Sequence, residues 1–197
     1  MLFRSLPDEC ELWIFNTRLQ HALVESLYAD RQRECMEARD VLRRFYPGLA
    51  HLAKIAPVQV DAHLADLPAP LHQRARHIAS ESERVAKTLE ALEAQDLDTV
   101  GALMIASHIS SRDDFENSTR ELDLLVDRLS KTPQVYGARL SGGGFGGAVI
   151  ALTEKDFHPR RAEAISARYA ARFGGPPTIL PCRIANGAGV DVLMGSD

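Results

Sequence analysis

The stretch Ala138-Arg139-Leu140-Ser141-Gly142-Gly143-Gly144-Phe145-Gly146-Gly147-Ala148-Val149-Ile150 decides how the rest of this sequence is interpreted. Five of the six residues at 142–147 are glycine, so five positions lack a Cβ and tolerate positive φ or the close approach of a ligand. Successive free N–H groups in such a loop form a concavity that suits anions, phosphate above all. The loop therefore predicts either a phosphate contact or a glycine-rich hairpin between two strands.

The overall composition is that of an ordinary globular protein. The chain has 197 residues, of which 45% are hydrophobic and 25% are charged, enough for one good domain or two small ones. A net charge of −4 argues against nucleic-acid binding, because no basic surplus exists to neutralise phosphates. No apolar run approaches the ~18 residues of a membrane span, and the start of the chain does not fit a signal peptide.

The three cysteines indicate the redox state of the protein. Cys10, Cys35 and Cys182 are widely spaced and contain no C-x-x-C pair. We therefore expect reduced thiols in a cytoplasmic protein and no disulfide frame or zinc site. Four further metal-ligand candidates are histidines without a zinc-type spacing, which we expect at the surface or at helix caps: His51, His63, His72 and His77.

Hydrophobic patterns predict an α+β fold. Short apolar runs predict strands at 12–17, 135–140, 148–152, 178–184 and 190–194. We expect the last four to form a largely antiparallel, four-stranded sheet with helices on one face, and the helices between 22 and 131 to form a cluster beside it. The first strand starts so early that we expect sequence to be missing before it. Two alternatives follow: the strand belongs to a sheet of the missing half, or it joins that half to this one.

Helix signals divide the middle of the chain. Asp96 is a predicted N-cap, and Ser118 with Glu121 forms a predicted capping box. The predicted helices cover residues 24–45, 58–64, a long segment from Pro70, a segment after Asp96, a segment after Ser118, and 159–173.

A dense polar segment, residues 107–118, lies between two of these helices. It contains His108, Arg112, Asp113 and Asp114. Two interpretations are open: an ordinary polar loop, or a network that braces the wall of an active site.

Common phosphate-binding motifs do not account for the glycine loop. It contains G-x-G-x-x-G formally, but a strand-like run follows it, whereas the dinucleotide fold requires a helix. The P-loop pattern G-x-x-x-x-G-K-[ST] and the G-x-S-x-G elbow are both absent.

Three segments together resemble the GHMP sugar kinases in their galactokinase form. Residues 137–147 resemble the third conserved motif of that family. Residues 107–123 resemble its SHxSxRDDFxxS…ELD segment, and residues 16–35 are similar to its N-S-x-x-x-H-x-x-x-x-S-x-Y-x-x-R-x-x-x-C stretch. The three segments occur in the right order over most of the chain.

The resemblance implies ATP-dependent transfer of a phosphoryl group to the anomeric hydroxyl of a galactose-like sugar. It implies a GHMP kinase C-terminal domain, ferredoxin-like with an added helical cluster, at 19–197, with 1–18 as a strand segment from the boundary with an N-terminal half. Tyr28 matches the tyrosine that lines the sugar pocket. The loop at the phosphate end of the site matches Ser141, Gly142, Gly143, Gly144, Phe145, Gly146 and Gly147.

The family's other motifs are absent from this sequence. These are the G-R-x-N-L-I-G-E-H-x-D-Y segment that binds the sugar, the second Gly/Ser-rich motif that grips ATP, and the M-D-Q segment that carries the aspartate base. We therefore expect no catalytic or metal-ligating residue in this chain, with ATP and Mg²⁺ held mainly by an N-terminal half. The chain alone should be inactive, and it could form a homodimer through the exposed face between the halves. The alternatives are a non-catalytic module that binds sugar and ATP, and a pseudo-kinase remnant.

Overall fold

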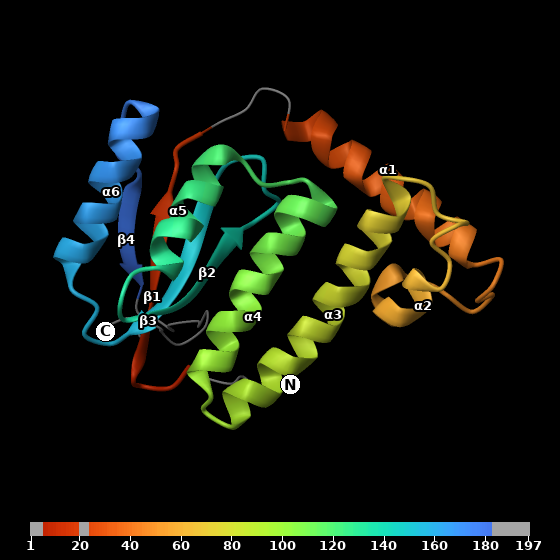
Figure 1. The fold of residues 1–197 in the computed structure, drawn as a ribbon, viewed down its shortest axis with the longest axis horizontal. Coiled ribbons are helices and arrows are strands. Elements are labelled where there is room, and N and C mark those ends of the chain that lie inside the picture. Colours follow the sequence, from red (N-terminus) through yellow and green to blue (C-terminus); the bar gives the residue numbers. More distant parts are fainter. Residues whose placement is uncertain (1–5, 20–23, 183–197) are drawn as a thin grey trace, which may run out of the picture.

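The computed structural model describes residues 6–19 and 24–182 (Figure 1). In chain order the elements are β1 (Cys10–Asn16), α1 (Val24–Leu42), the 3₁₀ turn η1 (Leu52–Lys54), α2 (Pro57–Asp61), α3 (Leu71–Glu93), α4 (Leu97–Ser110), the π-helical turn η2 (Ser111–Phe115), α5 (Arg120–Ser130), β2 (Val135–Ser141), β3 (Ala148–Glu154), α6 (Pro159–Phe173) and β4 (Thr178–Cys182).

The four strands form one antiparallel sheet in the order β2-β3-β1-β4. Ile14 of β1 pairs with Ile150 of β3 on one side and with Leu180 of β4 on the other. Helix α5 lies between β1 and β2 in the chain, and α6 lies between β3 and β4. This β1-α5-β2-β3-α6-β4 order confirms the predicted ferredoxin-like, α+β architecture, with α1 to α4 inserted between β1 and α5 (Figure 1).

The predicted strand composition of this sheet needs one correction. Three expected strands are present as β2, β3 and β4, but the remaining strand is β1, at the centre of the sheet. Of the two alternatives for the first strand, the one that places it in a sheet of the missing part is therefore wrong. An apolar run shows that a strand is buried but carries no information about partners more than 130 residues away. The strand expected at 190–194 lies outside the described residues.

The main core lies between the sheet and helices α5 and α6. Trp13 and Phe15 alternate along β1, so both point to the same face of the sheet, where α5 and α6 pack. The α5 side of this core consists of Leu122, Leu125, Val126 and Leu129. These are the apolar positions that the helical pattern predicts.

A second core holds the inserted helices together. It joins α1, η1, α2 and the first half of α3, and its buried residues include Leu42, Leu52, Val60 and Ala75. A third, smaller core forms where α4 and the end of α3 meet the sheet, around Val100 and Leu152. The inserted helices are thus a cluster beside the sheet that α4 connects to β2 (Figure 1).

The helix caps agree with the sequence in one case and differ in another. Asp96 is the N-cap of α4, and its side chain accepts a hydrogen bond from the Thr99 N–H at 3.0 Å. The N-cap of α5 is Thr119, so the predicted capping box at Ser118 is wrong. The Ser118 hydroxyl instead donates to Asp123 Oδ1 at 2.6 Å, which leaves the next residue to cap the helix. Across residues 6–19 and 24–182, the structure contains no helix that is both long and apolar enough to span a bilayer.

Candidate functional site

The glycine loop connects β2 to β3 through a run of left-handed backbone. The φ angles are 83° at Gly142, 82° at Gly144, 123° at Gly146 and 81° at Gly147, values that L side chains rarely adopt. Phe145 is the one non-glycine residue with positive φ in the loop, at 57°, and its side chain is buried. Phe145 therefore anchors the loop through its ring, whereas Gly142 and Gly143 are exposed.

Asn117, just before α5, holds the loop at its tip. The Phe145 N–H donates to the Asn117 carbonyl at 2.6 Å, and Asn117 Nδ2 donates to the Gly143 carbonyl at 3.1 Å. A Cβ on Gly144 would overlap the Asn117 carbonyl. The N–H groups of Gly143 and Gly144 donate to no acceptor in the described part of the chain. They are therefore available to an anionic ligand.

The end of β1 holds the other side of the loop. Both the backbone N–H and the hydroxyl of Thr17 donate to the Gly147 carbonyl, at 2.8 and 2.7 Å. The loop is thus fixed by two segments that are distant in sequence.

A pocket of about 340 Å³ opens between α1, η2 and this loop. The side chain of Tyr28 is 57% exposed, and a Cβ on Gly143 would contact its ring at 3.6 Å. The structure thus brings Tyr28 together with Gly142 and Gly143, as one wall and one lip of the same pocket. The remaining lining residues are Arg31, Gln32, Cys35, His77, Ser111, Phe115, Asn117, Arg139 and Leu140.

Two arginines give the pocket a positive character. Arg31 lies one helical turn after Tyr28 and pairs with Glu34 at 2.6 Å. Arg139 of β2 is 3.5 Å from Glu81. Carboxylates therefore orient both guanidinium groups, which retain donors for a phosphate or carboxylate.

Arg74 of α3 links the two sides of the pocket from beneath. It is 1% exposed and donates to Glu34 at 2.6 Å, to Glu116 at 2.7 Å and to the Asp114 carbonyl. Burial raises the pKa of Glu34, but hydrogen bonds from Arg74 and Arg31 outweigh it, and the net pKa is lowered. The α1 wall and the segment preceding Asn117 are thus joined by one buried cation.

Comparisons with known proteins agree with this geometry. Residues 88–174 match the family model described as GHMP kinases C terminal. The chain contains a GHMP kinase C-terminal domain. It is 36% identical over 184 residues to a galactokinase of Roseiflexus sp. (strain RS-1), covering 93% of the chain and 47% of that protein. It is 37% identical over 197 residues to a galactokinase of Chloroflexus aurantiacus (strain ATCC 29366 / DSM 635 / J-10-fl), covering 98% of the chain and 49% of that protein.

Solved structures extend the comparison. The crystal structure of Lactococcus lactis galactokinase complexed with galactose superposes with a TM-score of 0.86 at 33% identity, over 93% of this chain and 47% of that one. The L. major mevalonate kinase complexed with R-mevalonate matches with a TM-score of 0.55 at 20% identity, over 90% of this chain and 43% of that one, a likeness of fold alone. The chain spans about half the length of the curated relatives it matches.

In this GHMP kinase domain, the predicted supporting residues separate into two pairs. His108 is buried; its Nε2–H donates to Asp123 at 3.1 Å, and its Nδ1 accepts from the Leu140 N–H at 3.3 Å. Asp114 accepts from the Ser110 hydroxyl at 2.7 Å. These two residues connect α4 to α5, to β2 and to η2.

The second pair of supporting residues lies at the surface. Arg112 and Asp113 pair with each other at 2.7 Å, and neither side chain lines the pocket. Their segment is the turn η2, in which α4 continues as π-helix instead of giving way to a loop. The pocket lining from this turn comes instead from Ser111 and Phe115.

His77 is a pocket residue that the sequence does not identify. It was expected at the surface, but it is 6% exposed, and its ring stacks on Phe115 with centroids 4.5 Å apart. Its Nδ1 lies 3.0 Å from the Ser110 hydroxyl. Burial lowers the pKa of His77 to about 4, against a partly opposing effect of Glu81, so the ring is neutral at pH 7. The expectation is wrong because isolated histidines carry no burial signal.

The sequence contains a signal for some of the other pocket residues and none for others. Arg31 and Cys35 stand within the same motif as Tyr28, and their i+3 and i+7 spacing was a usable signal. Burial raises the pKa of the Cys35 thiol to about 11, which makes it a poor nucleophile. The contact of Asn117 with the loop joins segments 26 residues apart and has no local signal.

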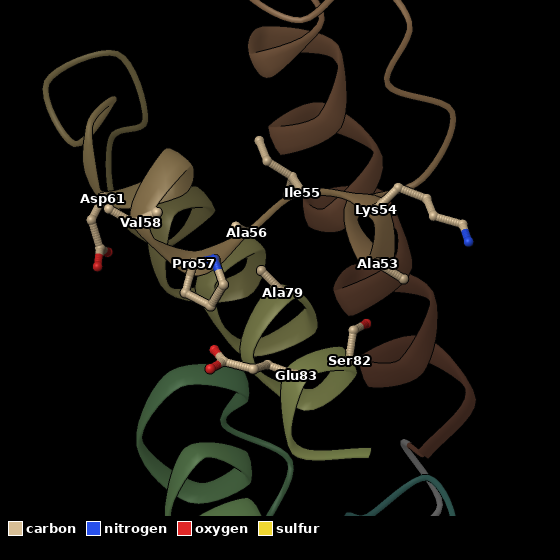
Figure 2. Close-up of a pocket in the computed structure, with 10 residues that line it drawn as sticks. All are labelled: Ala53, Lys54, Ile55, Ala56, Pro57, Val58, Asp61, Ala79, Ser82 and Glu83. Atoms are coloured by element: carbon tan, nitrogen blue, oxygen red, sulfur yellow. The ribbon is translucent and has the colours of Figure 1, made fainter. Parts of the chain in front are cut away.

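A second hollow, of about 740 Å³, lies on the inserted helices between η1, α2 and α3. Figure 2 shows Pro57 and Ala79 in its centre, with Lys54 and Asp61 extending on opposite sides. It contains no residue of the glycine loop, so we do not assign it to the same site. Among residues 6–19 and 24–182, no three His, Cys, Asp or Glu side chains are grouped to hold a metal ion.

Proposed function

We propose that this chain is the C-terminal half of an ATP-dependent sugar 1-kinase of the galactokinase type. The observation that carries the proposal is the position of the Tyr28 ring beside Gly143 of the glycine loop, in one pocket. The level of identity to full-length galactokinases supports it. The reaction is transfer of the γ-phosphoryl group of ATP to the anomeric hydroxyl of galactose or a related sugar.

The pocket residues divide into two roles in this proposal. Tyr28 forms part of the sugar wall, because an exposed aromatic ring offers an apolar face and a hydroxyl. The loop at residues 141–147 lies at the phosphate end, where the N–H groups of Gly143 and Gly144 and the Arg31 guanidinium donate to phosphate oxygens. Phe145 contributes through its buried ring, which fixes the loop, and not through direct contact. His108 and Asp114 hold the elements behind the loop.

The remaining parts of the reaction are assigned to an N-terminal half. Phosphoryl transfer depends on positioning and on charge stabilisation, for which Mg²⁺ bound to ATP neutralises the developing charge. We assign the Mg²⁺ ligands, the base and most ATP contacts to that half, which fits a chain that spans about half of its relatives. We expect the chain alone to be inactive, and its face toward the missing half to be the one through which two copies would associate.

A complementation experiment tests this assignment. The purified chain and the N-terminal half of the Roseiflexus galactokinase are assayed separately and after co-expression, with galactose-dependent ADP release as the readout. We expect turnover only in the co-expressed pair, and loss of most of it with Tyr28→Ala. Turnover by the chain alone would refute the division of roles.

The same experiment addresses the non-catalytic alternative. If the co-expressed complex is intact by size-exclusion chromatography and binds galactose and ATP, but transfers no phosphate, the chain is a binding module and not an enzyme half. Testing galactose, N-acetylgalactosamine, galacturonate and arabinose in parallel defines the sugar.

A further inference from the structure

A basic groove lies on the outer helix layer, away from the pocket of Tyr28. It has a volume of about 290 Å³ and lies between the end of α5 and the first half of α6. Its lining residues are Arg128, Lys131, Thr132, Pro133, Arg161, Ala164, Ile165 and Arg168. Four of these eight are cationic and none is acidic, although the whole chain has a net charge of −4.

Helix α6 forms one wall of the groove. Arg161, Ala164, Ile165 and Arg168 follow an i, i+3, i+4, i+7 spacing, so they share one face of the helix. Ile165 is buried against the core, and the small Ala164 leaves space above it. The two arginine Cα atoms are separated by two helical turns, roughly 10 Å along the axis.

The cations of the groove are incompletely neutralised. Asp127 pairs with Lys131 and is 3.9 Å from Arg128 Nε, outside hydrogen-bond distance. Arg128 Nε is buried and has no hydrogen-bond partner in the described part of the chain. Within the same residues, Arg161 and Arg168 form no ion pair. Asp127 is therefore paired with Lys131 and close to Arg128, and Arg161 and Arg168 have no carboxylate partner in the described part of the chain.

We propose that this groove binds a small polyanion that carries phosphate or carboxylate groups. Guanidinium groups bind such oxyanions through paired, charge-assisted hydrogen bonds, and a buried, unpartnered donor gains most from one. The space is at the small end of ligand pockets, which fits a compact multiply charged molecule and not an extended chain. The 11-residue helix α5 separates the groove from Asn117 and the glycine loop, so the site is distinct from the pocket there.

The test uses the full chain and two probes, inorganic tripolyphosphate and citrate, at constant ionic strength. Titration is followed by calorimetry and by amide NMR shifts. We expect one equivalent of tripolyphosphate to shift amides at 128–132 and 161–168, and R161Q and R168Q each to weaken binding about tenfold. If citrate shifts the same amides, the groove is a general oxyanion site. If tripolyphosphate shifts them and citrate does not, the groove is a phosphate site.

The matched controls are R160Q and R44Q, which remove the same charge from exposed positions outside the groove, on α6 and just after α1. They should weaken binding less than twofold, because an exposed charge outside the groove is screened and donates no hydrogen bond to the ligand. Equal losses in all four variants, shifts confined to residues 141–147, or no binding by either probe would each overturn the proposal.

Discussion

The backbone of Gly101 in α4 lies directly against the backbone of Gly137 in β2. A Cβ added to Gly101 would overlap the Tyr136 carbonyl group, and one added to Gly137 would overlap the Gly101 carbonyl group. Strand β2 runs from this contact to Ser141 and into the glycine loop. The contact therefore sets how closely the inserted helices approach the strand that carries the site.

Alanine at either position should destabilise the fold. Because backbone atoms cannot move aside, we expect Gly101→Ala and Gly137→Ala each to lower the free energy of unfolding by about 1–3 kcal/mol or more. Urea unfolding followed by circular dichroism measures the effect. The control is Gly48→Ala, whose added Cβ meets nothing within 4 Å and which should change stability by less than about 0.5 kcal/mol. Equal effects at all three positions would contradict the packing argument.

The sequence predicts local elements better than their pairing. Helix α6 begins and ends where its pattern predicts, because Pro159 starts it and Gly174 takes the left-handed conformation that ends it. The central position of β1 follows from pairing with residues 148–154 and 178–182, and no local pattern encodes such contacts. The polar segment after Ser110 continues as π-helix, and Arg74 of α3 donates to the Asp114 carbonyl within it, a contact between residues 40 apart that no local pattern encodes.

The candidate site shows the same division. The glycine loop and Tyr28 are recognisable from the sequence, since glycine runs and the tyrosine motif are local. The sequence does not indicate that Tyr28 lies beside Gly143 or that Asn117 donates a hydrogen bond to the loop, because both depend on how α1 and the start of α5 pack. The burial of His77 depends likewise on stacking against Phe115.

Within the loop, Gly144 and Gly142 should respond differently to alanine. Both have φ near +82°, so each substitution carries a backbone cost of about 1–2 kcal/mol. An added Cβ at Gly144 also overlaps the Asn117 carbonyl, whereas at Gly142 it meets nothing within 4 Å. We expect Gly144→Ala to shift the Phe145 amide resonance by breaking its bond to Asn117, and Gly142→Ala to leave it nearly unchanged. Similar shifts of the Phe145 amide in both variants would show that the backbone strain common to both, and not the overlap with Asn117, disturbs the loop.

Removal of Arg74 should leave Arg31 as the one remaining cation beside Glu34 and Glu116 among the described residues. Arg74→Met takes away the buried cation that these two carboxylates share, and we expect the free energy of unfolding to fall by about 2–4 kcal/mol. The fall should not be larger, because Glu34 keeps Arg31 and Glu116 is 55% exposed. The pKa of Glu34 should rise, since Arg74 contributes to holding it low. Arg33→Met, at a 62% exposed side chain with the same charge change, should cost under about 1 kcal/mol.

Hydrogen exchange separates a positioning role of Arg74 from general stability. If Arg74 supports the segment that holds the loop, Arg74→Met should speed exchange at residues 116–117 and 143–145 more than at the core strand β3. Uniform acceleration across the chain would indicate that the arginine acts only on global stability.

His77 should make stability depend on pH between about pH 4 and pH 6.5. Its pKa is about 4 in the folded chain because of burial, against the ordinary value of 6.5 that it regains on unfolding. The unfolded state therefore binds the extra proton, so this contribution is complete above pH 6.5 and is lost as pH falls toward 4. Between pH 7.5 and pH 5 the free energy of unfolding should fall by about 2 kcal/mol from this group.

The variant His77→Gln isolates that contribution. It removes the titrating ring but retains a polar group toward Ser110, so its stability should be lower at pH 7.5 and should change less between pH 7.5 and pH 5. Burial raises the pKa of Glu81, but hydrogen bonds from Arg84 and Ser107 outweigh it, so the pKa is lowered. The contribution of Glu81 to stability is therefore lost only at a pH more acidic than the range from pH 7.5 to pH 5. The control His51→Gln, at an exposed position, should retain the wild-type pH dependence. If His77→Gln retains it too, the acid sensitivity comes from groups other than the buried histidine.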